Sequence, residues 1–151
     1  MTNGDEPVMF YRVGDPYDFL SNFSEYALHL DGKHWPTVEH YYQAQKFLGT
    51  PDEDEVRQAE SALQAAIMGR ERTRPLRADW DQVRDSIMER VVAEKFRQHP
   101  DIAQKLRDTG TRRLVKHTKG DAYWGDGGDG SGQNRLGEIL MRLRDRLNAE
   151  G

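Results

Sequence analysis

The chain contains 151 residues, a length that fits one domain large enough to bury a hydrophobic core. Hydrophobic residues make up 36% and charged residues 32% of it, which indicates a globular protein rather than a disordered one. The net charge of −4 argues against a protein that binds nucleic acid mainly through phosphates, and the absence of cysteine excludes disulfides, thiolate nucleophiles and cysteine-ligated zinc. Because the polar, acidic residues 1–6 lack the features of a signal peptide and no apolar run is long enough to span a membrane, we expect a cytoplasmic protein without a membrane partner.

The first third of the chain predicts strands followed by a helix. Three runs are rich in strand-forming side chains: 8–13, 26–30 and 33–35. Asp31-Gly32 between the last two runs is a strong hairpin signal, so we expect a small antiparallel sheet. Thr37 can cap the helix that follows by accepting a hydrogen bond from a free backbone N–H, and this helix ends near Gly49.

Two further helices are predicted in the middle of the chain. Thr50-Pro51 is a good helix start and Gly69 a good stop, so a second helix should run from Pro51 to about Met68. Its expected core face consists of Val56, Ala59, Leu63 and Ile67. Asp79 can cap the third helix. The apolar stripe of that helix consists of Trp80, Val83, Ile87 and Val91.

The last third predicts a short helix over residues 101–107, a strand or extended segment over 113–118, and a loop with six glycines between Gly120 and Gly132. A final helix begins near Asn134 or Arg135. Its expected core face consists of Leu136, Ile139, Leu140, Leu143 and Leu147. The chain as a whole therefore predicts a mainly α protein of the α+β class. We expect one domain over residues 1–151, with its core at about 8–147, about five helices and a small antiparallel β element near the N-terminus.

The first helix carries the most informative pattern. Residues three, four and seven positions apart share one face of a helix. One stripe therefore holds Glu39, Tyr42, Gln43 and Lys46. The opposite face holds Tyr41, Ala44, Phe47 and Leu48, which we expect to pack in the core. A carboxylate, an amide and an amine in one line have two interpretations: a solvated face with a Glu–Lys pair, or a functional site.

Glu39 and Lys46, together with Asp121 further along the chain, suit the cleavage of a bond between ribose C1 and a base nitrogen. This cleavage builds positive charge on the sugar, and carboxylates can stabilise that charge while they move a proton. A desolvated lysine can instead attack C1 and pass through a Schiff base. Both routes stay open at the level of the residues.

The glycine-rich loop is a second candidate site. Its residues 125–130 match the pattern G-x-G-x-x-G of dinucleotide-binding motifs. Such a motif needs a strand directly before it and a helix directly after it, and this sequence predicts neither, so we reject that interpretation. Free N–H groups at the Asn134 end of the next helix attract phosphates, and glycines such as Gly125 and Gly132 permit close backbone approach. The alternative is a flexible connector.

Two tryptophans can offer flat surfaces to a base or a sugar. Trp124 lies in the glycine-rich loop beside Asp121, which could place a ring and a carboxylate at a pocket edge. Trp80 lies on an apolar stripe, so a core position is its competing interpretation. The five histidines form no zinc pattern, and we expect no metal and no cofactor; for His40 we expect a structural hydrogen-bonding role.

The segment from Trp35 to Phe47 resembles the WPTVEHYYQAQKF signature of the YbiA/NADAR family. Further motifs of that family follow in the same order: Phe19 to Phe23, Gly69-Arg70, Arg77 to Trp80, Lys95-Phe96, Asp121 to Gly125 and Gly132 to Gly137. The resemblance covers about residues 8–147 and is specific, because a long continuous motif is joined by several ordered ones.

The resemblance implies an N-glycosidase that either cleaves early riboflavin-pathway intermediates or removes ADP-ribose from guanine bases. Its substrate is then nucleotide-like, either free or presented on DNA or RNA. Carried over by motif, Lys46 is the covalent participant and Glu39 and Asp121 are the carboxylates. The resemblance also implies substrate contacts by Trp80, Trp124, Ser21, Asn22 and Phe23. We also expect Tyr42 and Gln43 of the helix stripe to contact the substrate.

Two other classes of function remain open. A non-catalytic module that binds ADP-ribose or a related nucleotide would keep the pocket and need no acid, base or amine. A helical domain that binds a partner protein would explain the helices but not the glycine loop with its aspartate and tryptophan. The presence of both Glu39 and Lys46 favours the enzyme.

Overall fold

The computed structural model describes residues 6–150, and the chain forms two compact units. One unit is Asn22–Gln98, and the other joins the chain up to Ser21 with the chain from His99 onward. Most of the N-terminal segment on which the prediction of location rests lies outside the described residues. Within those residues, no helix is both long and apolar enough to cross a membrane.

The unit Asn22–Gln98 begins with the expected hairpin. Strand β2 (Leu28–Leu30) pairs with β3 (Lys33–Trp35) in antiparallel register. Asp31 and Gly32 form the turn with φ values of 57° and 77°, a left-handed pair that glycine and aspartate tolerate better than most residues. This result confirms the antiparallel β element.

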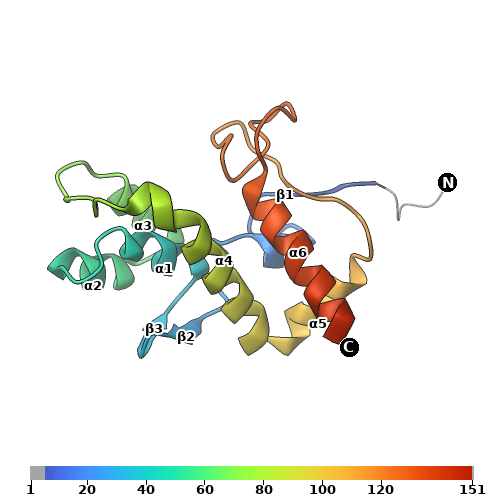
Figure 1. Ribbon diagram of the computed structural model, residues 1–151, viewed down its shortest axis with the longest axis horizontal. Helices are drawn as coiled ribbons and strands as arrows, with labels where there is room; N and C mark the ends of the chain where they lie inside the picture. The colour runs from blue at the N-terminus through green and yellow to red at the C-terminus, as the bar shows by residue number, and fades with distance from the viewer. Residues whose placement is uncertain (1–5, 151) are drawn as a thin grey trace. The chain divides into compact units, whose positions relative to one another are not determined.

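Helix α1 (Val38–Gln45) follows the hairpin and forms the centre of this unit. The Thr37 side chain accepts a hydrogen bond from the His40 backbone N–H, as expected of a cap. All eight residues of the helix are buried, because α2, α3 and α4 pack around it, and Figure 1 shows α1, α2 and α3 side by side. A helix enclosed in this way has no solvent face.

The predicted second helix is wrong as a continuous element. The chain forms α2 (Pro51–Arg57) and a separate α3 (Ala62–Gly69), because the Ser61 side chain accepts the Gln64 N–H and starts a new helix. This restart changes the helix phase, so Leu63 and Ile67 are 59% and 47% exposed instead of inward. The residues of α3 that are buried are Ala62, Ala65, Ala66, Met68 and Gly69. The Ser-x-x-Gln spacing of a capping box was the signal for this start.

Helix α4 (Trp80–Gln98) closes the unit. Trp80 and Val91 of its predicted stripe are buried, whereas Val83 and Ile87 are only half-buried. The rest of its buried face consists of Met88, Val92, Lys95 and Phe96. The buried face of α4 is therefore rotated about the helix axis relative to the predicted apolar stripe.

The second unit contains β1 (Val8–Phe10), a 3₁₀ turn η2 (Asp18–Leu20), α5 (Pro100–Asp108), β4 (Leu114–Lys116) and α6 (Arg135–Glu150). Strand β1 pairs in parallel with β4, with Val8 opposite Leu114. The expectation that residues 8–13 join the antiparallel sheet is thus wrong, because their partner lies at the other end of the chain. In Figure 1, α6 runs beside α5, and it also packs on β4. The described residues thus show six α-helices and two small sheets, which confirms the α+β class.

Candidate active site

Glu39 and Gln43 form a buried polar pair on α1. The Gln43 Nε2 donates a 2.7 Å hydrogen bond to Glu39 Oε2, one helical turn away. The two residues are only 7% and 4% exposed, so the stripe is not a solvated face. Because burying a carboxylate costs free energy, its retention here favours a chemical role. The bond to Gln43 also fixes the direction of the Glu39 carboxylate.

Lys46 follows α1 and is held between aromatic rings. Its Nζ lies 5.9 Å from the centre of the Tyr42 ring and 5.7 Å from that of Trp80, and these two rings are 5.2 Å apart. Nζ also donates a 3.2 Å hydrogen bond to the Gly69 carbonyl. Tyr42 and Trp80 are 6% and 5% exposed, so Trp80, predicted as a flat surface for the substrate, is like Tyr42 mainly a buried wall beside the amine.

Burial lowers the pKa of Lys46 from 10.5 to about 8, with the charges of Arg72, Arg70 and Arg84 acting in the same direction and Glu39 opposing them. Loss of hydration disfavours the ammonium form, and nearby cations add repulsion. A substantial share of the amine is therefore neutral near physiological pH. The neutral amine is the form that attacks a carbonyl-like carbon.

Gly69 is a residue whose role the motif alone did not reveal. A Cβ built at Gly69 would overlap the Gln43 amide, meeting Cδ at 2.6 Å and lying still closer to Oε1. Gly69 therefore lets α3 approach α1 closely enough for its carbonyl to reach Lys46. In the sequence Gly69 was visible only as the stop of a helix. In the structure it is not among the glycines with a positive φ, so its close contact with Gln43 explains why this position has no side chain.

Gly69→Ala is expected to lower turnover by about tenfold or more, because the Gln43 amide must leave Glu39 to make room for the methyl group. The free energy of unfolding should fall by about 1 kcal/mol, since a flexible side chain absorbs the clash. Urea denaturation and steady-state kinetics measure the two effects. Gly120→Ala is the control, because its Cβ would meet nothing closer than Thr118 Oγ1 at 3.8 Å. Equal losses in both variants would contradict this account.

Asn22 is linked to Glu39 by a hydrogen bond between their backbones. Its carbonyl accepts the Glu39 N–H at 3.1 Å, and its side-chain Nδ2 lies 3.4 Å from the Met88 sulfur. Asn22 is buried and Phe23 half-buried in this unit, while Ser21 is a buried residue at the end of the other unit. The structure therefore shows a positioning contact of Asn22 at the start of α1, and the predicted substrate contacts of the three residues stay predictions.

Asp121 belongs to the other unit and is held in an acceptor role. Its Oδ1 accepts the N–H groups of Tyr123 and Trp124, and its Oδ2 lies 3.0 Å from Lys116 Nζ. Burial opposes ionisation, but the Lys116 charge and these hydrogen bonds outweigh it and lower the pKa of Asp121. The carboxylate is thus ionised at neutral pH, which suits it to stabilise positive charge rather than to donate a proton.

The prediction of free N–H groups at the start of α6 is wrong. The N–H groups of Asn134, Arg135 and Leu136 donate to carbonyls of residues 125, 123 and 124, at 2.9 to 3.1 Å. The Asn134 side chain bridges the Lys116 N–H and the Leu114 carbonyl, and it has a left-handed φ of 49°. The N–H groups at the start of α6 are therefore already bonded to carbonyls of the preceding loop. They stabilise the fold of that loop.

Gly125 and Gly132 allow the same loop to pack closely against its own backbone. A Cβ at Gly125 would lie 2.8 Å from the Asp121 carbonyl oxygen, and one at Gly132 would lie 2.5 Å from the Gly125 oxygen. A side chain at either position would therefore collide with backbone atoms.

Asp126, which the sequence did not single out, is 4% exposed and accepts hydrogen bonds from His117 Nδ1 and from the N–H groups of Thr118 and Gly128.

Trp124 is 8% exposed and packs edge-on against Tyr123, with ring centres 4.9 Å apart. Its ring is thus mostly covered. His40 forms hydrogen bonds with Thr37 Oγ1 and the Ala59 carbonyl, which confirms its structural role.

Among residues 6–150, no group of three or more potential ligands that could hold a metal ion is found.

Comparison with known proteins places the chain in a family. The profile of the NADAR domain matches residues 9–148. The chain belongs to the NADAR family. N-glycosidase YbiA of Escherichia coli K12 is 47% identical over 146 residues, covering 97% of this chain and 91% of that protein. The solved NMR structure of E. coli YbiA matches with a TM-score of 0.88 at 46% identity, over 97% of this chain and 87% of that one.

A second NADAR relative carries a different name. A riboflavin biosynthesis protein of Vibrio vulnificus is 43% identical over 143 residues, and the match covers 95% of this chain but only 39% of that protein. The structural match confirms the predicted α+β fold and the resemblance to the family. The names of the relatives support the prediction that this NADAR chain is a glycosidase with a nucleotide-like substrate.

Proposed function

We propose that this chain is an N-glycosidase that hydrolyses the bond between ribose C1 and a base nitrogen through a Schiff base on Lys46. The observation that carries the proposal is the Lys46 amine itself, desolvated between two rings with its pKa lowered to about 8. A buried carboxylate, Glu39, acts on the same amine through its charge. A nucleophile and a proton carrier therefore lie in one small region of one unit.

The reaction proceeds in two balanced stages. The neutral Lys46 amine attacks C1, the C1–N bond breaks, and Glu39 passes the proton lost by the amine to the departing base nitrogen. The bond between C1 and the ring oxygen then breaks and the ring oxygen takes up a proton, which gives an open-chain protonated imine. Water adds to C1 of that imine to form a carbinolamine, and cleavage of its C–N bond releases the sugar aldehyde, the Lys46 amine and the proton taken up at ring opening.

Asp121 and Trp124, which belong to the other unit, keep proposed roles of their own. The ionised Asp121 carboxylate suits the stabilisation of the positive charge that builds on the sugar, and it is not the proton donor, because its pKa is lowered. Trp124 donates its backbone N–H to Asp121, and stacking of its ring on the substrate, although the ring is only 8% exposed, stays a proposal. Gly125, Gly132 and Asn134 support this segment by holding its backbone, and a contact with substrate phosphate is a further proposal for them.

Two substrate classes fit the proposal: guanine carrying ADP-ribose, free or within DNA or RNA, and a phosphoribosyl intermediate of riboflavin synthesis. The relatives' names contain both N-glycosidase and riboflavin biosynthesis. A panel of both substrates, with the released sugar and base separated by liquid chromatography and mass spectrometry, distinguishes them. Release of ADP-ribose supports the first class, and release of a ribose phosphate supports the second.

A module that only binds nucleotides is the alternative. It has no use for a desolvated amine beside a buried carboxylate, whose burial costs stability. Binding of the panel compounds without release of any sugar, in both the natural chain and Lys46→Arg, would favour this alternative over the enzyme.

A further inference from the structure

Arg77 binds the end of α1 although it lies on the segment that leads into α4. Its backbone N–H donates to the Lys46 carbonyl at 3.0 Å, and its Nη1 donates to the Gln45 carbonyl at 3.3 Å. These two carbonyls belong to the last turn of a helix, where no intrahelical partner remains. One residue therefore satisfies two groups at the position that carries the reactive amine.

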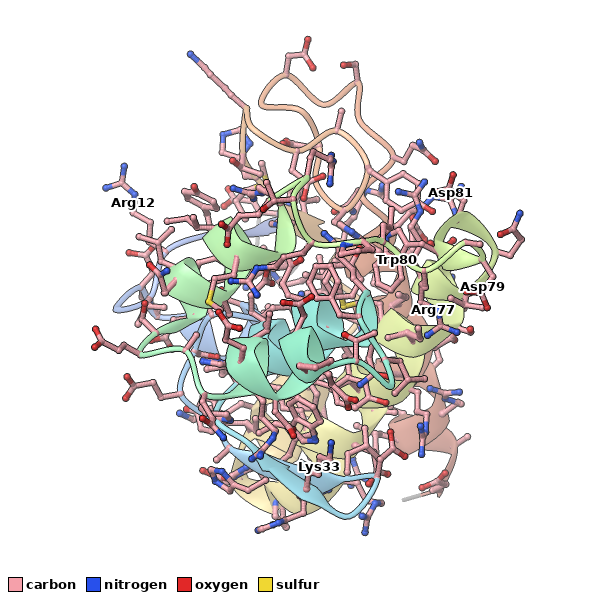
Figure 2. All side chains as sticks on the ribbon, turned by 90° about the vertical axis from the view of Figure 1, so that its left-hand side faces the viewer. Arg12, Lys33, Arg77, Asp79, Trp80 and Asp81 are labelled. Atoms are coloured by element: carbon pink, nitrogen blue, oxygen red, sulfur yellow. The ribbon has the colours of Figure 1, made fainter. Side chains whose placement is uncertain are left out.

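Asp79 holds the Arg77 guanidinium in this orientation. The pair is bidentate, with Nε–Oδ1 at 2.6 Å and Nη2–Oδ2 at 3.0 Å, and Figure 2 shows both side chains beside Trp80. A fork of two parallel bonds fixes the guanidinium plane more firmly than a single contact. The Arg77 side chain is 23% exposed, so the pair is partly shielded from solvent.

Trp80 follows directly and begins α4. Its N–H donates to the Arg77 carbonyl at 3.3 Å, and its ring lies 5.7 Å from Lys46 Nζ. The chain thus connects the end of α1, through the Arg77–Asp79 pair, to a ring that shields the amine from water. Neither Arg77 nor Asp79 makes a hydrogen bond or ion pair with Lys46 Nζ in the contacts that the structure shows.

We propose that Arg77 and Asp79 are positioning residues that clamp the last turn of α1 to the start of α4 and so hold Trp80 against the Lys46 amine. The inference rests on the proposed role of Lys46. When the clamp is loosened, Trp80 moves away, water reaches the amine, and Lys46 stays charged to a higher pH. The charged groups that act on Lys46 are otherwise unchanged: Glu39 on α1, Arg70 and Arg72 after α3, and Arg84 on α4.

Two variants with opposite charge changes test the clamp. Arg77→Gln removes a cation, and Asp79→Asn removes an anion while keeping the size of the side chain. Direct electrostatic effects on Lys46 would move its pKa upward in the first variant and downward in the second. Loss of positioning predicts an upward shift in both, because both break the bidentate pair.

The readout is the pH dependence of Lys46 labelling by trinitrobenzenesulfonate, followed by mass spectrometry of the peptide that contains Lys46. This measurement needs no substrate, so it is independent of whether the proposed reaction is correct. We expect a midpoint near pH 8 for the natural chain. A shift of about one unit upward in both variants would lower labelling near pH 7 about tenfold.

Arg97→Gln is the matched control. Arg97 forms a similar bidentate pair with Glu94 on the same helix, with bonds of 2.8 and 2.7 Å, and is 67% exposed at its side chain. This variant should leave the midpoint unchanged. In the assay with substrate, the clamp variants should lower kcat much more than they raise KM, because the amine and not the binding surface is disturbed.

An unchanged midpoint in a folded Asp79→Asn protein, or a downward one, would overturn the proposal. Circular dichroism and the thermal midpoint establish folding, and Asp79→Asn keeps the test valid if Arg77→Gln unfolds. If labelling shifts as expected but no panel substrate is cleaved, the clamp stands and the proposed function fails.

Discussion

Lys46→Arg is expected to abolish turnover and to remove the adduct that borohydride traps with the natural chain. Arginine keeps a positive charge near Glu39, but its guanidinium stays protonated and cannot form an imine with C1. The measurement is mass spectrometry of the protein after borohydride is added during turnover, together with sugar release. Loss of a covalent nucleophile should reduce the rate at least about a thousand-fold, the scale seen when a reacting group is removed.

Lys33→Arg is the control for this variant. Lys33 forms ion pairs with Glu53 and Asp54 in the same unit, and arginine can preserve them. We expect full activity and normal trapping. If Lys46→Arg also retained much of its activity and no adduct formed with the natural chain, water would attack C1 directly and Lys46 would be only a charge partner.

The same amine predicts the pH profile. The neutral form must attack, and the pKa of Lys46 is lowered to about 8, so kcat/KM should rise with pH and level off above about pH 8 on this limb. Each pH unit below the pKa lowers the neutral fraction about tenfold. A limb near the ordinary lysine value of 10.5 would contradict the desolvation seen in the structure.

Glu39→Gln is expected to slow turnover by roughly a hundred-fold or more, the usual scale for loss of a general acid–base. An amide retains the shape and an acceptor for the Gln43 Nε2 bond, but it cannot take or give the proton. Single-turnover kinetics with the cleaved panel substrate measure the effect. Because charge is removed near Lys46, its pKa should also fall, so the rate must be compared above pH 8.

Glu53→Gln separates chemistry from burial. Glu53 is 8% exposed, close to the 7% of Glu39, and it accepts the Gly49 N–H and pairs with Lys33. Its loss should lower stability by about 1–2 kcal/mol and change turnover by only a few-fold. If both variants lost activity equally, Glu39 would be a structural carboxylate.

Local signals predicted much of the unit Asn22–Gln98. Asp31-Gly32 specified the hairpin, and Thr37 specified the start of α1, because both act through backbone geometry within a few residues. The break between α2 and α3 was missed although Ser61 and Gln64 carry a local signal for it. Leu48 was assigned to the core face but is 52% exposed, because α1 ends before it.

The parallel pairing of β1 with β4 could not be predicted from either strand alone. Each is short, and the pairing depends on a long-range contact that no neighbouring residue specifies. The same holds for the start of α6, where the loop's own carbonyls take the N–H groups that the sequence suggested were free. The glycines of the loop could be seen in the sequence. Their structural role could not, because it depends on which backbone segments pack against each other.

The sequence by itself determined that Glu39, Gln43 and Lys46 share one face of a helix, since that follows from helical spacing. It could not decide between a solvated stripe and a site, because spacing says nothing about what covers a face. The tertiary structure shows that the stripe is covered, because Gly69 and Trp80, distant in the chain, pack on the amine and reduce its hydration. Desolvation is a property of the whole environment, and it lowers the pKa of Lys46 to about 8, the shift on which the proposed role of this amine as a nucleophile rests.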